Sequence, residues 1–181
     1  MTRKLFIPAL ITLILFLTLP VFYLSNYSQT ITHEQEKIVY ELPYPGILPD
    51  HPLYIFKTLR DKIWAFSTRD NLKKADIYRL FSDKRAKMAQ ELTDKGKTDL
   101  AITTISKGEK YFLKIPKLLK DSKNQGVAPK QEFLDKLKAS NMKHKETIQD
   151  LLKRAPEGEQ YRITEVLKIN ESLQKQLENL Q

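Results

Sequence analysis

Residues 70–97 read "DNLKKADIYRLFSDKRAKMAQELTDKGK" and predict a long amphipathic helix at the centre of the fold. Asp70 is a residue type that caps helix amino termini, and Gly96 is a typical helix stop. The apolar positions follow helical spacing and define one face of this helix: Leu72, Ala75, Tyr78, Phe81, Met88, Ala89 and Leu92.

The composition of the whole chain also favours helices. The 181 residues include only 5 glycines and 9 prolines, while 29% of them are charged, which is unlike a sheet protein with many turns. The chain has no cysteine, so the sequence excludes disulfides, thiol catalysis and thiolate metal sites.

Shorter helical patterns flank residues 70–97. Before them, residues 52–66 predict a helix with one apolar stripe, formed by Leu53, Phe56, Leu59, Ile63 and Phe66. After them, a helix is predicted from Thr98, in which Gly108 suggests a close helix crossing and Pro116 is expected to introduce a bend.

The last part of the chain, residues 129–181, predicts an antiparallel helical hairpin. One helix covers about residues 130–154, and "APEGE" separates it from a helix with a coiled-coil-like seam of Ile163, Val166, Asn170, Leu173, Leu177 and Leu180. Asn141 and Asn170 either fix the register of this hairpin or face water. The predicted fold is therefore all-α, an antiparallel bundle of about five helices, with a three-helix module at residues 52–124 and the hairpin at 129–181.

The amino-terminal segment, residues 1–24, predicts a membrane anchor or a signal peptide. Leu5 to Leu24 is an uncharged run of 20 residues, long enough to cross a hydrocarbon layer of about 30 Å, and Arg3 and Lys4 favour a cytoplasmic amino terminus. The run is longer than an ordinary signal core and lacks a good cleavage site, which favours an uncleaved anchor over a cleaved signal. Both alternatives place the remaining chain outside the cytoplasm, anchored or secreted.

A linker and proline-rich spacer are predicted at residues 25–51. Pro43, Pro45 and Pro49 restrict the backbone, which suggests a semi-rigid connection that sets the direction of the domain. Either Asp50 or His51 is expected to cap the following helix, with Pro52 in its first turn. Leu48, Leu53 and Tyr54 are candidates to fold back against the bundle.

The stretch "LPYPGILPDHPLYIFKTLRDKI" resembles a bacterial family of extracytoplasmic helical domains of unknown function. The resemblance covers about residues 42–112, and its hallmark lies in Leu48, Pro49, Asp50, Pro52, Leu53, Tyr54 and Lys57. It implies a helical module that follows a signal or an anchor, and it implies no activity.

Basic residues are concentrated in the middle of the chain. Residues 57–130 contain 19 basic and 9 acidic side chains, a net charge of +10. The whole chain has a formal net charge of +9, so the other residues together contribute −1. The candidates for contact with an anionic surface are Lys73, Lys74, Lys84, Arg85, Lys87, Lys107, Lys110, Lys114, Lys117 and Lys120. The alternatives are a solvated lysine face that maintains solubility, or contact with anionic lipid head groups or wall polymers. The pattern argues against nucleic acid, because no aromatic and arginine stacking pattern accompanies it.

The sequence predicts no catalytic residue, no cofactor and no metal site, so a non-enzymatic role is expected. His33, His51 and His144 are scattered, and His144 is expected to be a partly buried bundle residue rather than a ligand. A hydrolase would require two acidic groups that converge in a cleft.

The functional hypothesis is a membrane-anchored, extracytoplasmic interaction module of the cell envelope. Its partner would meet the basic surface or the seam of the last helix. The alternative is an envelope sensor or chaperone-like protein that binds apolar client segments in a concave apolar groove.

Overall fold

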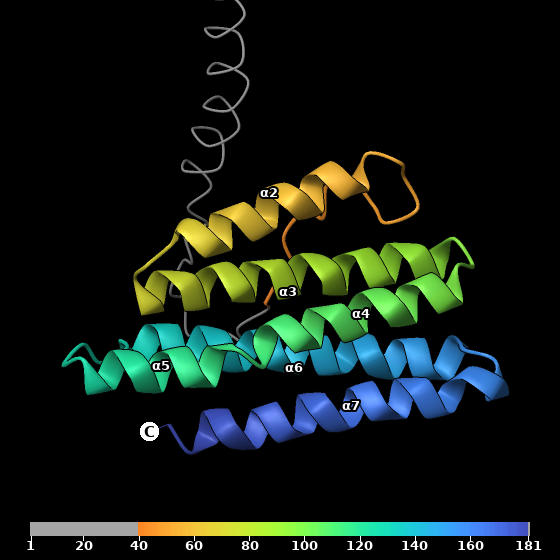
Figure 1. The fold of residues 1–181 in the computed structure, drawn as a ribbon. Coiled ribbons are helices and arrows are strands. Elements are labelled where there is room, and N and C mark those ends of the chain that lie inside the picture. Colours follow the sequence, from red (N-terminus) through yellow and green to blue (C-terminus); the bar gives the residue numbers. More distant parts are fainter. Residues whose placement is uncertain (1–39, 181) are drawn as a thin grey trace, which may run out of the picture. The chain divides into compact units, whose positions relative to one another are not determined.

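The long helix predicted from residues 70–97 forms the centre of the fold as α3, Asn71–Asp94, in the computed structural model, which describes residues 40–180 (Figure 1). The Asp70 side chain accepts a hydrogen bond of 2.9 Å from the Lys73 amide, as the cap prediction requires. Gly96 has a φ of 70° and lets the Lys97 amide reach the Leu92 carbonyl at 2.8 Å. Both predicted ends of this helix are confirmed.

The other regular elements of the described residues are also helices, which confirms the all-α prediction. They are α2 (Tyr54–Ser67), α4 (Thr98–Phe112), α5 (Ile115–Asn124), α6 (Gln131–Arg154) and α7 (Glu157–Glu178).

The single bent helix predicted from Thr98 is wrong, because the structure divides it into α4 and α5. The chain turns at Leu113 and Lys114, and Pro116 lies in the first turn of α5. A proline is tolerated there because the first amides of a helix have no intrahelical acceptor.

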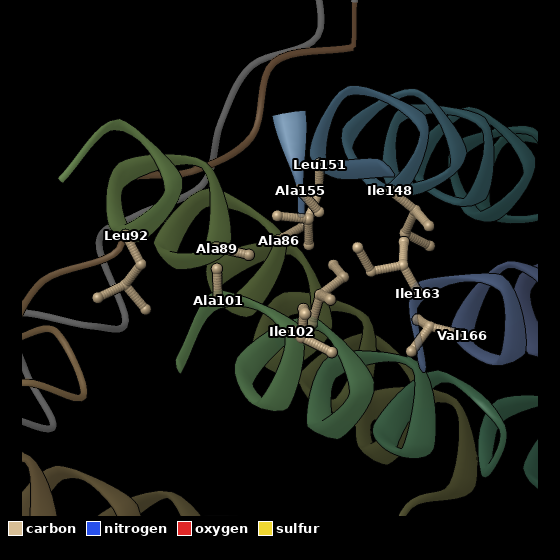
Figure 2. Close-up of a cluster of buried hydrophobic side chains, with 11 residues drawn as sticks. Ala86, Ala89, Leu92, Ala101, Ile102, Ile148, Leu151, Ala155, Ile163 and Val166 are labelled. Carbon is tan, nitrogen blue, oxygen red and sulfur yellow. The ribbon is translucent and has the colours of Figure 1, made fainter. Parts of the chain in front are cut away.

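The hairpin of α6 and α7 packs against the helices that precede it. Figure 2 shows one apolar cluster in which Ala86 and Ala89 of α3 and Ile102 of α4 meet Ile148 of α6 and Ile163 of α7. A second cluster contains Phe112, Ile115 and Leu119 together with Leu137 and Leu173. These two clusters therefore pack the hairpin against α3, α4 and α5, and the seam of the last helix is part of them.

Asn141 and Asn170 fix the pairing of α6 with α7. Their side chains are 1% and 0% exposed, and each amide group donates to the main-chain carbonyl of the other residue, at 3.3 and 3.1 Å. Because slipping the register would leave these buried amides without acceptors, the register interpretation holds and the solvent-facing alternative is wrong.

Gly108 permits the close approach of α4 to α3 that its sequence position suggests. A Cβ atom at this position would lie 3.2 Å from the Arg85 Cβ and 3.4 Å from the Ser82 carbonyl oxygen. In addition, the Ser82 hydroxyl donates to the Gly108 carbonyl at 2.7 Å. A side chain at this crossing would therefore require its neighbours on α3 to move by a few tenths of an ångström.

We expect Gly108→Ala to lower the free energy of unfolding by about 1 kcal/mol. Overpacking costs about 1–3 kcal/mol, and the better helix propensity of alanine offsets about 1 kcal/mol of it. Gly158→Ala in α7 is the matched control, because a Cβ there meets nothing within 4 Å. Urea unfolding should show a loss for the first variant and a small gain for the second, and equal effects would contradict the tight crossing.

Residues 40–50, the described part of the predicted linker and spacer, form a strap along the bundle. Pro43, Pro45 and Leu48 are buried. The Lys57 ammonium donates to the Pro45 carbonyl at 2.5 Å, and burial lowers the pKa of Lys57 to about 8. Proline side chains are apolar, so burying them against the bundle lowers the free energy of the folded protein.

The predicted cap at the start of α2 is also wrong. Asp50 turns away from the helix, and its Oδ2 accepts from the Lys97 ammonium at 2.8 Å. His51 Nδ1 accepts from the Leu53 amide at 3.1 Å, before the helix begins at Tyr54. Asp50 therefore ties the strap to the loop between α3 and α4.

The apolar stripe of α2 is present but faces solvent. Phe66 is 89% exposed and Phe56 is 66% exposed, while Asp61 and Ala65 on the opposite side are buried. Leu48 folds back against the bundle as predicted and Tyr54 is half-buried, but the prediction for Leu53 is wrong because it is exposed.

The predicted anchor at residues 1–24 and most of the predicted linker lie outside the described residues. Within residues 40–180, none of the helices combines the length and the apolar character that crossing a membrane requires.

Candidate functional site

A group of charged side chains lies in the core where α3, α4 and α6 meet. The side chains of Asp83, Glu109 and His144 are 0% exposed. His144 Nε2 lies 2.9 Å from Asp83 Oδ1, and His144 Nδ1 lies 2.9 Å from Glu109 Oε1. An imidazole can donate from both nitrogens only when it is protonated. The position of His144 between two carboxylates therefore favours the imidazolium form.

The Asp83 carboxylate is fully satisfied by donors. Besides His144, its oxygens accept from the Ser140 hydroxyl at 2.5 Å, from Arg79 Nη1 at 2.6 Å and from the Tyr40 hydroxyl. His144 thus lies between Asp83 and Glu109, and Arg79 is shared between Asp83 and Asp76, to which its Nε donates at 2.8 Å. Buried charges are tolerated when they are paired and hydrogen-bonded in this way.

The pKa values of these groups follow from the arrangement. Burial opposes the charged form of His144, but hydrogen bonds and charges from Asp83 and Glu109 raise its pKa to about 9. Burial also opposes the charged form of Asp83, yet the His144 hydrogen bond and the Arg79 charge hold the pKa of Asp83 below its ordinary value. The two shifts favour the charged forms of both His144 and Asp83.

This buried group stabilises the bundle and offers no surface to a substrate. Two carboxylates do converge, as a hydrolase would require, but they converge in the core and not in a cleft. His144 is buried as predicted, and more completely. Within the described residues, no cluster of histidine and carboxylate side chains has the arrangement of a metal site.

The predicted basic residues separate into two sets in the structure. Arg85 of α3 is 4% exposed, and Lys107, Lys110 and Lys114 are exposed. The structure brings these four to one pocket. It does not bring the others there: Lys73, Lys74, Lys84, Lys87, Lys117 and Lys120.

The Arg85 pocket, as we call it, has a volume of about 340 Å³ and opens between α2, α3 and α4. Lys114 contributes from the turn after α4. Helix α2 adds residues that were not predicted, namely Tyr54, Thr58 and Lys62, and α4 adds Tyr111. The pattern of residues 52–66 indicated the apolar stripe but gave no signal for Tyr54 or Thr58 as pocket residues. Lys62 could have been found, because cations flank such a stripe.

The cations of the Arg85 pocket lack acidic partners. Among the ion pairs of the described residues, none involves Arg85, Lys62, Lys107, Lys110 or Lys114. The nearby Asp61 carboxylate accepts from Arg60 at 2.8 Å instead. The pocket is therefore a concentrated positive surface, since low-dielectric walls strengthen the field of unpaired charges.

Aromatic rings support two of these cations. The Arg85 guanidinium carbon lies 4.4 Å from the centre of the Tyr111 ring, and the Lys114 ammonium lies 5.0 Å from the same ring. Such contacts hold a cation in place without neutralising its charge.

The seam of the last helix cannot be the partner surface that the sequence suggested. Ile163, Val166 and Leu173 are 0%, 3% and 0% exposed in the bundle core. Apolar side chains at helical spacing pack against the nearest available face, which here is intramolecular.

The family comparison covers most of the described residues. The chain belongs to the family described as a domain of unknown function (DUF5667), which matches residues 46–180. The match thus extends through α6 and α7, beyond the stretch of 42–112 on which the resemblance was based. No curated protein and no solved structure matches the chain.

Proposed function

We propose that this member of the DUF5667 family is a non-enzymatic, membrane-anchored interaction module of the bacterial cell envelope. Its helical domain works outside the cytoplasm, and its partner is the anionic surface of the membrane that carries its anchor. The observation that supports this proposal is the solvent-facing apolar stripe of α2.

The stripe has the character of a helix that lies in a membrane interface. Its members share high exposure, from 51% to 89%: Leu53, Phe56, Leu59, Ile63 and Phe66, and Ile55 beside them is 68% exposed. Arg60 and Lys62 flank it on the two sides, and both are exposed. The only carboxylate of α2, Asp61, is 3% exposed and faces the bundle. Apolar side chains flanked by cations favour an interface with anionic lipids.

The sequence supplies a reason for the domain to remain near a bilayer. Between Leu24, the end of the apolar run, and Tyr40 there are 15 residues. A chain of that length spans at most about 50 Å, so an anchored domain experiences a high local concentration of the membrane surface. A modest intrinsic affinity of α2 is then sufficient for contact.

We expect a label at position 66 to enter the interface of anionic vesicles. The chain has no cysteine, so Phe66→Cys gives a unique site for a fluorescent label in the full-length protein. In vesicles with phosphatidylglycerol and quencher-bearing lipids, its fluorescence should be quenched several-fold more than in phosphatidylcholine vesicles. Met142→Cys on α6, which is 65% exposed, is the control and should be quenched weakly in both. Equal quenching at the two positions would contradict the contact through α2.

The anchor itself is tested by topology. Reporter fusions after Ser25 and at the carboxyl terminus should both report an extracytoplasmic position. Activity of a cytoplasmic reporter at the carboxyl terminus would overturn the proposed location, whatever the behaviour of α2.

A chaperone-like role remains the second candidate, because the same exposed stripe could hold apolar client segments. That role requires a concave apolar groove, whereas the stripe lies on one helix and the Arg85 pocket is lined by cations. The membrane surface is therefore the better partner.

A further inference from the structure

We propose that the Arg85 pocket binds one phosphate group, as a phosphomonoester or a phosphodiester. The inference deepens the proposed function by naming the chemistry that the basic surface recognises, and it rests on that function for the biological source of the ligand. The site itself lies on a different side of α2 from the apolar stripe, so the two can be tested separately.

Arg85 is the first reason for the assignment. The residue is 4% exposed, and no carboxylate among the described residues pairs with its guanidinium. Nη1 donates to the Phe81 carbonyl at 2.9 Å, whereas Nε is buried and has no hydrogen-bond acceptor in the described part of the chain. A buried arginine without an anion is costly, and a bound anion removes this cost.

The lysines that surround Arg85 are the second reason. Lys62 approaches from α2, Lys107 and Lys110 from α4, and Lys114 from the turn that follows. Four ammonium groups and one guanidinium exceed what a single carboxylate can balance. A phosphate group carries more charge and more acceptor oxygens, and arginine with lysine is the usual protein environment for it.

The walls of the pocket fit a group at the end of a larger molecule. The phenol groups of Tyr54 and Tyr111 line the pocket beside the cations, and both can donate to phosphate oxygens. Thr58 of α2 also lines the pocket, but its hydroxyl donates to the Ile55 carbonyl at 2.8 Å. A volume of about 340 Å³ holds a phosphate together with a short polar substituent such as glycerol. The source can thus be a lipid head group, a phosphate-containing polymer or a free phosphate ester.

Titration calorimetry on the full chain in a maltoside detergent tests the site with inorganic phosphate and with glycerophosphoglycerol. We expect saturable binding of one equivalent, and no such binding of chloride at matched ionic strength. The variant Lys110→Ala/Lys114→Ala should bind at least ten-fold more weakly. Both side chains are exposed, so their removal leaves the core packing unchanged.

The matched control is Lys117→Ala/Lys120→Ala. It removes the same charge from the same basic run, and its lysines are also exposed but do not line the pocket. We expect a change of less than two-fold for this variant. Equal weakening by the two double variants would show diffuse charge attraction and would overturn the site. Arg85→Lys, which keeps the charge but loses the planar fork, should also weaken binding.

Vesicles of phosphatidylglycerol distinguish the sources of the phosphate. Because the proposed anchor inserts into any vesicle, vesicle binding here means quenching of a label at Leu113→Cys, an exposed position beside the pocket, by quencher-bearing phosphatidylglycerol in excess of that in phosphatidylcholine. Vesicle binding that is sensitive to Lys110→Ala/Lys114→Ala, without binding of the two soluble probes, would support the site and assign it to a lipid head group. Vesicle binding that is insensitive to this variant, again without soluble-probe binding, would overturn the pocket and leave the contact through α2 standing. If the Phe66→Cys label is not quenched but the soluble probes still bind, the contact through α2 is overturned and the pocket is supported.

Discussion

His144→Leu is expected to lower the free energy of unfolding by about 3–5 kcal/mol, because it removes one partner of a buried ionic group. Leucine has a similar volume, so the cavity contribution is small. Asp83 would retain Arg79, Tyr40 and Ser140, but Glu109 would retain only the Asn170 amide at 3.2 Å. The main cost is therefore an uncompensated carboxylate at position 109. Urea unfolding monitored by circular dichroism measures this loss.

A second substitution separates the cost of the unpaired charge from a general loss of core packing. Glu109→Gln alone should destabilise the protein, since it removes the partner of His144 Nδ1. In the His144→Leu background the same change should be neutral or stabilising, because it removes the charge that has lost its counterion. Met142→Ala on the exposed side of α6 should cost less than about 0.5 kcal/mol. Additive effects of the His144 and Glu109 variants would show that the two side chains do not form an ion pair.

The second large effect is a loss of stability as the pH rises. The pKa of His144 is about 9 in the folded protein, against an ordinary value of 6.5. The charged form is thus favoured by folding, and its contribution is complete below pH 6.5 and lost as the pH rises through about 9. The difference between the two values corresponds to about 3 kcal/mol. Of this, roughly 2 kcal/mol should disappear between pH 6 and pH 8.

Other groups act outside this window or in the opposite direction. Asp83, with its lowered pKa, contributes above its ordinary value of 3.8 and loses that contribution as the pH falls further. Lys57, whose pKa burial lowers to about 8, makes the fold more stable as the pH rises above 8. Subtracting the pH profile of His144→Gln from that of the wild type removes the Lys57 effect, and the Asp83 effect, which depends on His144, lies below this window. A difference profile that is flat between pH 6 and pH 8 would contradict a charged His144.

The helices could be predicted because their signals are local. Asp70 and Gly96 act on the backbone next to them, so the ends of α3 were correct. The division at Leu113 and Lys114 has no comparable signal before Pro116. It depends on how α5 reaches the second apolar cluster through Ile115 and Leu119, which is a tertiary effect.

The burial of the charged residues could not be predicted from the same kind of pattern. Lys87 follows Asp83 at the i,i+4 spacing that is typical of a solvated helix face, and Glu109 lies between Lys107 and Lys110 in the basic run. Only the angular positions of α3, α4 and α6 around the core bring the two carboxylates to His144. Similarly, the stripe of α2 was visible in the sequence, but its direction depends on Asp61 and Ala65 facing α3.

The strap also determines how force enters the domain. Tyr40, the first described residue, donates to Asp83 and accepts from Arg79 at 2.7 Å, so the amino-terminal edge of the fold reaches the ionic centre directly. A force applied to the preceding chain would act on the Tyr40 hydrogen bonds before it acts on any helix. A fragment that begins at the family boundary, residue 46, would lack the Tyr40 hydrogen bonds. In single-molecule extension we expect it to unfold at a lower force than a fragment that keeps Tyr40.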